Sequence, residues 1–142
     1  MSLIKICGLR ELPHMLAAAE AGADLLGMAF VPGVRRRIDV DAARQLASSF
    51  RQQVLGGPQL VGLFADQPVD QVNHVADIVG LDCVQLCGIE GPDHWSAVDR
   101  PILQVLHVDE PPDSTERTRA AAVTILAQRL LRLEAADGLA IL

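Results

Sequence analysis

A lysine, a cysteine and a glycine stand together near the start of the chain, in the apolar run Leu3-Ile4-Lys5-Ile6-Cys7-Gly8. The run predicts a short strand that ends at Cys7. Reacting groups in α/β folds collect at the C-terminal ends of strands, so this thiol is a candidate for chemistry. The alternative is that Cys7 is one more small buried hydrophobic residue.

Three consecutive arginines form the densest positive charge in the chain, Arg35-Arg36-Arg37. They follow the second predicted strand and therefore belong to the same end of the sheet as Cys7. Guanidinium groups can hold a carboxylate or a phosphate by paired hydrogen bonds, which makes this run a candidate anion site. A solvated loop is the alternative interpretation.

Gln85 and Cys87 alternate along the fourth predicted strand and so share one face of it. A glutamine inside an apolar strand needs either a structural hydrogen bond or a ligand, and both remain open. Among the histidines, His107 lies near the end of the fifth predicted strand and is placed for chemistry. The other three fall off the apolar helix faces and are predicted to be solvated: His14, His74 and His94.

Strand-like and helix-like segments alternate, which is typical of βαβ units around a parallel sheet. After the strand around Ile4, further strands are predicted at 25–30, 59–64, 83–87 and 102–108, with a sixth beginning at 138. Helices are predicted between them and after the fifth strand. Pro13 suits a first turn, Asp39 suits an N-cap, and Gly22 and Gly80 suit helix ends.

Length and composition predict one domain, residues 1–142, large enough to bury a core. No apolar run approaches the roughly 20 residues of a membrane helix, and no signal peptide is recognised. Three cysteines without paired C-x-x-C spacing argue against disulfides and structural zinc, and favour a reducing cytoplasm. A net charge of −6 and few, scattered aromatics argue against nucleic acid as a partner. Neither G-x-G-x-x-G nor a P-loop is present.

The ordered set of motifs resembles the phosphoribosylanthranilate isomerase family and covers nearly the whole chain. The segments that carry the resemblance are Lys5–Gly8, Ala17–Asp24, Gly27–Phe30, Val61–Phe64 and Gly80–Leu86. The resemblance implies a (βα)8 TIM barrel, of which about five βα units and the start of strand six are present. It also implies an isomerase of tryptophan biosynthesis that converts N-(5-phosphoribosyl)anthranilate to 1-(2-carboxyphenylamino)-1-deoxyribulose 5-phosphate. No metal or organic cofactor is expected.

The resemblance also assigns roles within this Amadori rearrangement, which needs a general acid at the furanose ring oxygen and a general base at C2′. It implies that Cys7 is the base and that Arg36 contacts the anthranilate carboxylate. The acid is expected to be an aspartate directly after Leu142. Two positions depart from the family pattern, because Cys87 replaces a histidine and Gln104 replaces a lysine. The expected substrate-binding residues are Arg36, Gln85, Lys5 and Cys87.

Two alternatives stand beside this hypothesis. The chain could be an inactive partial barrel that acts as a binding or self-associating module, because an open sheet exposes a strand edge. The expected oligomeric state is accordingly a monomer or a homodimer, with self-association if the barrel is truly truncated. Alternatively, the strands could form an open, doubly wound sheet with a ligand at its switch point, in which case the strand order would reverse.

Overall fold

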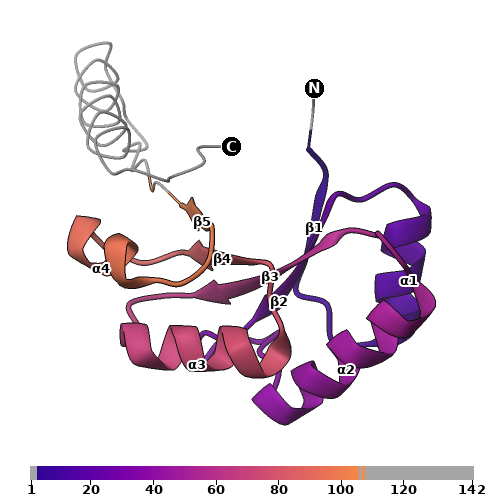
Figure 1. Cartoon of the computed structure of the whole chain (residues 1–142), viewed down its shortest axis with the longest axis horizontal. Helices are drawn as coiled ribbons and strands as arrows, with labels where there is room; N and C mark the ends of the chain where they lie inside the picture. Colours follow the sequence, from indigo (N-terminus) through magenta and orange to yellow (C-terminus); the bar gives the residue numbers. More distant parts are fainter. Residues whose placement is uncertain (1–2, 106, 108–142) are drawn as a thin grey trace, which may run out of the picture.

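The computed structural model describes residues 3–105 and 107, in which five strands alternate with four helices (Figure 1). The elements are β1 (Lys5–Cys7), α1 (Leu12–Glu20), β2 (Leu25–Ala29), α2 (Val40–Gln53), β3 (Gln59–Phe64), α3 (Val69–Val79), β4 (Cys83–Leu86), α4 (Pro92–Ala97) and β5 (Ile102–Gln104). The predicted long helix after the fifth strand, the predicted sixth strand and the acid expected after Leu142 lie outside the described residues.

The five strands form one parallel sheet in the order β1-β2-β3-β4-β5. Each strand pairs with its neighbour in sequence, so the strand order never reverses within the described residues. A doubly wound sheet requires such a reversal, and this alternative is therefore wrong for this part of the chain. Sequential parallel order with a helix between each pair of consecutive strands is the topology of a (βα)8 barrel, and the predicted α/β class is confirmed.

Local sequence signals account for the helix boundaries. The Asp39 side chain caps α2 by accepting a hydrogen bond from the backbone N–H of Asp41 at 2.9 Å. Pro13 lies in the first turn of α1, where its missing N–H costs nothing. Gly80 ends α3 in the left-handed conformation, with φ +72°, which a side chain would disfavour. All three signals were predicted from the sequence.

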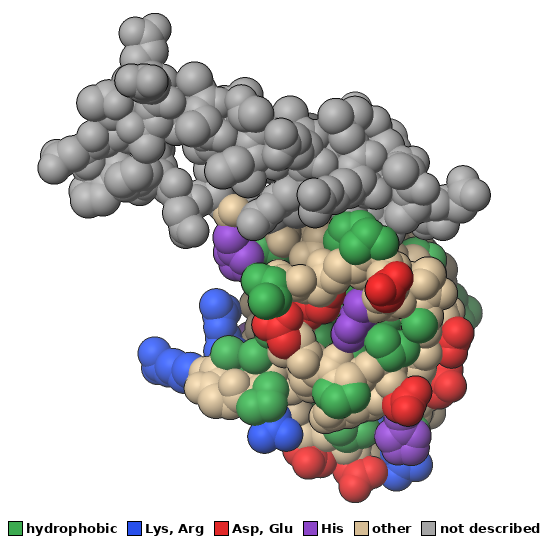
Figure 2. Space-filling view, turned by 90° about the vertical axis from the view of Figure 1, so that its left-hand side faces the viewer, with side chains coloured by type: hydrophobic (Ala, Val, Ile, Leu, Met, Phe, Trp, Pro, Cys, Tyr) green, Lys and Arg blue, Asp and Glu red, His purple; other side chains and the backbone are tan. Residues whose placement is uncertain are grey.

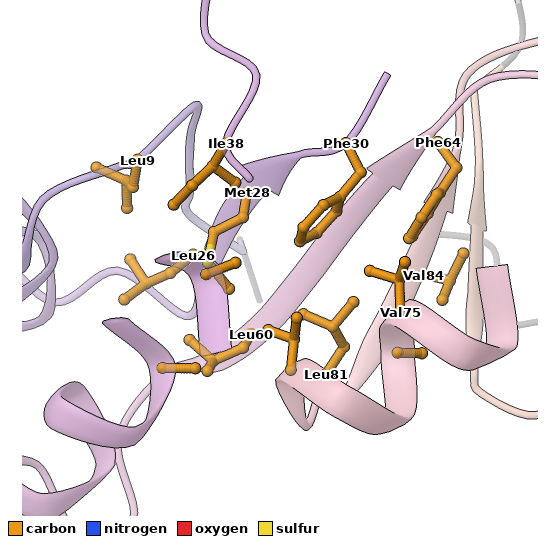
Figure 3. Packing of buried hydrophobic residues seen from close by; sticks show 14 of the residues in the cluster. Leu9, Leu26, Met28, Phe30, Ile38, Leu60, Phe64, Val75, Leu81 and Val84 are labelled. Carbon is orange, nitrogen blue, oxygen red and sulfur yellow. The ribbon is translucent and has the colours of Figure 1, made fainter. Parts of the chain in front are cut away.

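The hydrophobic core lies between the helices and one face of the sheet (Figure 3). Leu26, Leu60 and Val84 are 0–1% exposed there, and the rings of Phe30 and Phe64 stack with centroids 5.3 Å apart. The opposite face of the sheet, here called the interior face, carries a smaller apolar cluster. Its buried members are Leu25, Val61 and Cys83, with Leu63 and Leu103 packed against them.

A charged cluster closes the sheet at the N-terminal ends of β3 and β4. Arg51 of α2 donates through Nη2 to the carbonyl of Gly80 at 2.6 Å and to Asp82 Oδ2 at 2.9 Å. The same carboxylate oxygen accepts the backbone N–H of Leu60 at 2.8 Å. This Arg51–Asp82 cluster ties α2, α3 and two strands together at the end of the sheet that lies away from Cys7.

The strands are slightly shorter than predicted. β2 and β4 each end one residue early, at Ala29 and Leu86, although Cys87 still donates its N–H to the carbonyl of Phe64 at 2.8 Å. β5 ends at Gln104 rather than at residue 108, and residues 106 and 108 are not described. No helix within residues 3–105 has the length and apolar character needed to cross a membrane.

Candidate active site

Lys5 and Cys7 lie on the interior face of β1, next to Gly27 of β2, which pairs with Cys7. A Cβ atom placed on Gly27 would lie 3.2 Å from the Cys7 thiol and 3.2 Å from the Lys5 ammonium nitrogen. The missing side chain at Gly27 therefore leaves the space that both groups occupy. Lys5 is the only lysine of the chain. The structure thus places a single ammonium group beside the candidate thiol at the C-terminal end of the strand.

Arg36 lies across the end of β1. Its Nη1 donates to the backbone carbonyl of Cys7 at 3.2 Å. The side chain also passes over Gly8, where a Cβ would come within 2.8 Å of Arg36 Cδ and where φ is +77°. Within the described residues, the exposed side chains of Arg35 and Arg37 make neither hydrogen bonds nor ion pairs. The structure therefore brings one arginine of the run to the backbone of Cys7 and Gly8 and leaves the other two in solvent.

Gln85 and Cys87 share the interior side of β4, as their alternation predicted. Gln85 Nε2 donates to Cys87 Sγ at 3.3 Å, and both residues are half-buried. The Gln85 amide therefore has a partner within the chain, one of the two outcomes left open by its position in an apolar strand. His107 is exposed, and its Nε2 lies 2.7 Å from the carbonyl oxygen of Cys87. Both contacts place polar groups around the end of β4.

Burial raises the pKa of two thiols, Cys83 in β4 and Cys87 directly after it. It raises the pKa of the Cys83 thiol from 9.0 to about 11. Burial also raises the pKa of the Cys87 thiol, although the hydrogen bond from the Gln85 amide opposes this effect. Both thiols are therefore protonated and uncharged near neutral pH. A thiol must lose its proton before it can act as a base, and the raised pKa makes this loss less favourable for both Cys83 and Cys87.

The structure gives a role to one departure from the family pattern, Gln104, and corrects one sequence-based expectation, the solvation of His94. Gln104, which the resemblance equates with a lysine of the family, accepts a hydrogen bond from the indole N–H of Trp95 at 2.8 Å. It pairs with Leu86 and faces the helices, away from Cys7. His94 is only partly exposed, and its Nε2 is buried without a partner among the described residues. A six-residue helix is too short for periodicity to define its buried face, which explains the wrong prediction for His94.

Three polar residues near the site were missed by the sequence analysis: Asp66, Gln67 and Glu90. Gln67 is 7% exposed and Glu90 is 9% exposed. They lie in the loops that follow β3 and β4, at the same end of the sheet as Cys7. Loop residues have no periodicity, so the only available signal was their place directly after two predicted strands.

The surface charge shows no stripe on the face drawn in Figure 2. Most of the Lys and Arg side chains visible there lie toward one margin, and acidic and hydrophobic side chains are interspersed over the rest (Figure 2). Across residues 3–105 and 107, no group of three or more His, Cys, Asp or Glu side chains is arranged to hold a metal ion.

A sequential parallel sheet with helices between its strands defines an α/β fold of the TIM-barrel type. The family model for N-(5′-phosphoribosyl)anthranilate (PRA) isomerase matches residues 4–131. The chain belongs to this family.

Known relatives agree with this assignment. The chain is 40% identical over 106 residues to the N-(5′-phosphoribosyl)anthranilate isomerase of Dehalococcoides mccartyi, which covers 75% of this chain and 48% of that protein. It superposes on the crystal structure of phosphoribosyl anthranilate isomerase from Thermotoga maritima with a TM-score of 0.72 and 28% identity, covering 88% of this chain and 58% of that one.

A second crystal structure of a phosphoribosyl anthranilate isomerase, in complex with reduced 1-(o-carboxyphenylamino)-1-deoxyribulose 5-phosphate, also matches with a TM-score of 0.72 and 28% identity, covering 88% of this chain and 61% of that one. The chain spans about half the length of the curated relatives it matches.

Proposed function

We propose that the complete protein converts N-(5′-phosphoribosyl)anthranilate to 1-(2-carboxyphenylamino)-1-deoxyribulose 5-phosphate. One observation carries the proposal. Cys7, within the segment that matches the family model, lies at the end of β1 beside Lys5 and under Arg36. This arrangement combines a proton acceptor with two cationic groups for an anionic substrate.

The reaction moves two protons. A general acid protonates the furanose ring oxygen, so the C1′–O bond breaks and the ring opens to a Schiff base. A general base then removes the proton from C2′, and the resulting enolamine tautomerises to the ketone. We assign the base to Cys7, because its sulfur occupies the open space next to Gly27 at the strand end. The acid is the aspartate expected after Leu142.

The substrate carries a carboxylate and a phosphate, and the site offers cations for such groups. A guanidinium has five N–H donors, of which Arg36 uses one on the carbonyl of Cys7. The remaining donors are available for the anthranilate carboxylate. Lys5 adds the single ammonium group of the chain. Gln85 and the protonated Cys87 thiol supply neutral polar contacts from β4.

The proposal is supported by the related isomerase that was crystallised with a reduced form of this product. The test is to incubate the complete protein with N-(5′-phosphoribosyl)anthranilate and to separate substrate and isomeric ketone by chromatography. We expect formation of the ketone, with no added metal or organic cofactor. A complete, folded protein that leaves the substrate unchanged would contradict the proposal.

The cytoplasm remains the expected compartment, because the three cysteines lack the spacing of a disulfide framework.

A second candidate, self-association with another copy of the chain, is favoured by the edge of the sheet. β1 is an edge strand within the described residues, and Leu3, Ile4 and Ile6 are 45%, 51% and 40% exposed. An apolar edge strand presents unpaired backbone groups to a second chain. Sedimentation velocity over a range of concentrations tests this candidate. We expect the larger species to disappear in Ile6→Lys, and an unchanged distribution would exclude this edge as the interface.

A further inference from the structure

The two most buried polar side chains of the described residues lie close to the site without being part of it. Gln67 and Glu90 are the only polar or charged side chains in this part of the chain that fall in the buried class. Burying a carboxylate or an amide costs free energy unless hydrogen bonds replace the lost water. The partners of these two side chains therefore indicate what the burial achieves.

Asp66 and Glu90 join the loop after β3 to the loop after β4. The Asp66 carboxylate accepts the backbone N–H of Ile89 at 2.8 Å, and the Asp66 backbone N–H donates to Glu90 Oε1 at 2.7 Å. Asp66 has φ +54°, the only positive φ of a non-glycine residue in the described chain. Aspartate tolerates this conformation better than most residues do, but it still carries strain. We call this pair of contacts the Asp66–Glu90 clamp.

Gly88 lies directly against the clamp. A Cβ atom on Gly88 would fall 2.4 Å from the carboxylate atoms of Asp66, closer than real side-chain contacts allow. Gly88 immediately follows Cys87, whose thiol receives the hydrogen bond from Gln85. The clamp therefore contacts the chain at Gly88, one residue after Cys87.

Gln67 extends the same connection to β2. Its Oε1 accepts the backbone N–H of Ala65 at 3.2 Å, and its Nε2 donates to the carbonyl of Phe30 at 3.4 Å. Phe30 follows the last residue of β2. The ends of three consecutive strands are thus linked by side chains from a single short loop.

The Asp66–Glu90 clamp includes a buried oxygen atom that lowers the stability of the fold and that a connection between two loops does not require. Glu90 Oε2 is buried and has no hydrogen-bond partner among the described residues. An unpaired buried carboxylate oxygen is unfavourable, and a glutamine amide oxygen could accept the same N–H from Asp66 without a buried charge. The charge at Glu90 strengthens the one hydrogen bond it makes, because ionised acceptors bind more tightly than neutral ones.

We propose that Asp66 and Glu90 are positioning residues of the site, which hold the Gln85–Cys87 end of β4 in place opposite Cys7 and Lys5. They act on the site through Gly88 and the loop backbone. The positional claim concerns the geometry of β4 and does not depend on the reaction. Only its catalytic consequence rests on the proposed function.

The three cysteines of the chain give a direct test. The whole chain is alkylated with iodoacetamide, and peptide mass mapping follows Cys7, Cys83 and Cys87 separately. In Asp66→Gly, which allows the positive φ but removes the carboxylate, we expect Cys87 to react at least about fivefold faster, the factor that the loss of one hydrogen bond corresponds to. The reaction of Cys7 and the protection of buried Cys83 should not change.

Gly88→Ala and a double variant make the test specific for the clamp. Gly88→Ala should also expose Cys87, because its methyl group displaces the Asp66 carboxylate. In the Asp66→Gly background that collision is absent, so Gly88→Ala should add little. Asp66→Asn should restore wild-type protection, because its amide oxygen can accept the Ile89 N–H and asparagine tolerates positive φ. Asp70→Asn, in the first turn of α3, is the matched control and should match the wild type.

Two outcomes would overturn the proposal. Unchanged alkylation of Cys87 in Asp66→Gly would show that the clamp does not hold the strand end. A parallel rise at all three cysteines would show a general loss of folding instead of local positioning. In the complete protein, Asp66→Gly should lower kcat at least as much as it raises KM, and Asp66→Asn should restore kcat. If the protein is no isomerase but Cys87 responds as expected, the proposed function fails and the clamp stands.

Discussion

The Arg36 guanidinium donates to the backbone carbonyl of Cys7, with 3.2 Å between Nη1 and the carbonyl oxygen. The two residues are 29 positions apart and belong to the loop after β2 and to the end of β1. The contact holds a positive charge over the strand end that presents the thiol. It also gives Arg36 a fixed place that its two neighbouring arginines lack.

Replacing Cys7 tests its role as the base. In the complete protein, Cys7→Ala should lower kcat by at least about 10²-fold and leave KM nearly unchanged, as expected for a positioned general base. Steady-state kinetics with N-(5′-phosphoribosyl)anthranilate provides the measurement. Cys83→Ala removes a thiol from the same face of the sheet and should keep most of the activity. Normal turnover by Cys7→Ala would remove Cys7 from the mechanism.

The three arginines should differ in their effects on the same assay. Arg36→Ala should lower kcat/KM by about tenfold or more, the expected scale for losing a charge-assisted hydrogen bond to a carboxylate. Arg35→Ala and Arg37→Ala, whose side chains make no contact within the described residues, are the matched controls. Equal and negligible effects of all three substitutions would refute the anion site.

Alkaline pH should destabilise the fold through Cys83. Its pKa is raised from 9.0 to about 11 in the folded chain, so the folded state disfavours the thiolate. The resulting stabilisation is complete below about pH 9 and is lost as pH rises toward 11; its size is on the order of 2 kcal/mol. Urea unfolding between pH 7.5 and 10.5 measures this loss.

The Cys83→Ala variant is the control for the pH dependence. Its free energy of unfolding should fall less steeply with pH than that of the wild type. Some decline will remain, because burial also raises the pKa of Cys87. The same slope in both proteins would show that Cys83 does not titrate in the unfolding equilibrium.

Gly27 should control the reactivity of Lys5. A methyl group at Gly27 would crowd three side chains, with Leu63 Cδ1 3.1 Å from its position and the Cys7 thiol and the Lys5 ammonium each at 3.2 Å. Lys5 is the only lysine, so acylation by an amine-reactive ester, with peptide mapping that separates its ε-amine from the α-amine, reports on this side chain. We expect Gly27→Ala to raise its acylation rate.

Gly91→Ala is the matched control for Gly27, because no atom lies within 4 Å of its added methyl group. It should leave the acylation of Lys5 unchanged. An identical Lys5 rate in Gly27→Ala and the wild type would mean that the three groups do not share this space.

The approach of Arg36 to Cys7 was predictable from the sequence, because the C-terminal ends of parallel strands meet at one edge of a sheet. The pairing of Gln85 with Cys87 followed from strand alternation. The orientation of Gln104 was not predictable, since a three-residue strand has no pattern and its face depends on pairing with Leu86. The register between β4 and β5 is set by tertiary packing and not by the local sequence.

The Asp66–Glu90 clamp escaped prediction for a related reason. Its two residues are 24 positions apart and lie in different loops, where no hydrophobic period operates. Asp66 and Gln67 precede Pro68, and the sequence at this point indicated only the start of a helix. Contacts between loops depend on the exact positions of the strands that carry them. The sequence pattern predicts the order of these strands but not the positions of the loop atoms.

The Arg51–Asp82 cluster joins α2 to β3 and β4 at the end of the sheet that is remote from Cys7. The contacts that hold these strands together and the residues around Cys7 therefore lie at opposite ends of the sheet. A library intended to change substrate preference can vary exposed positions such as Val34 and Ile89, which are 41% and 89% exposed in the loops after β2 and β4. As long as Arg51 and Asp82 are kept, such variants should retain the tie that holds these strands together.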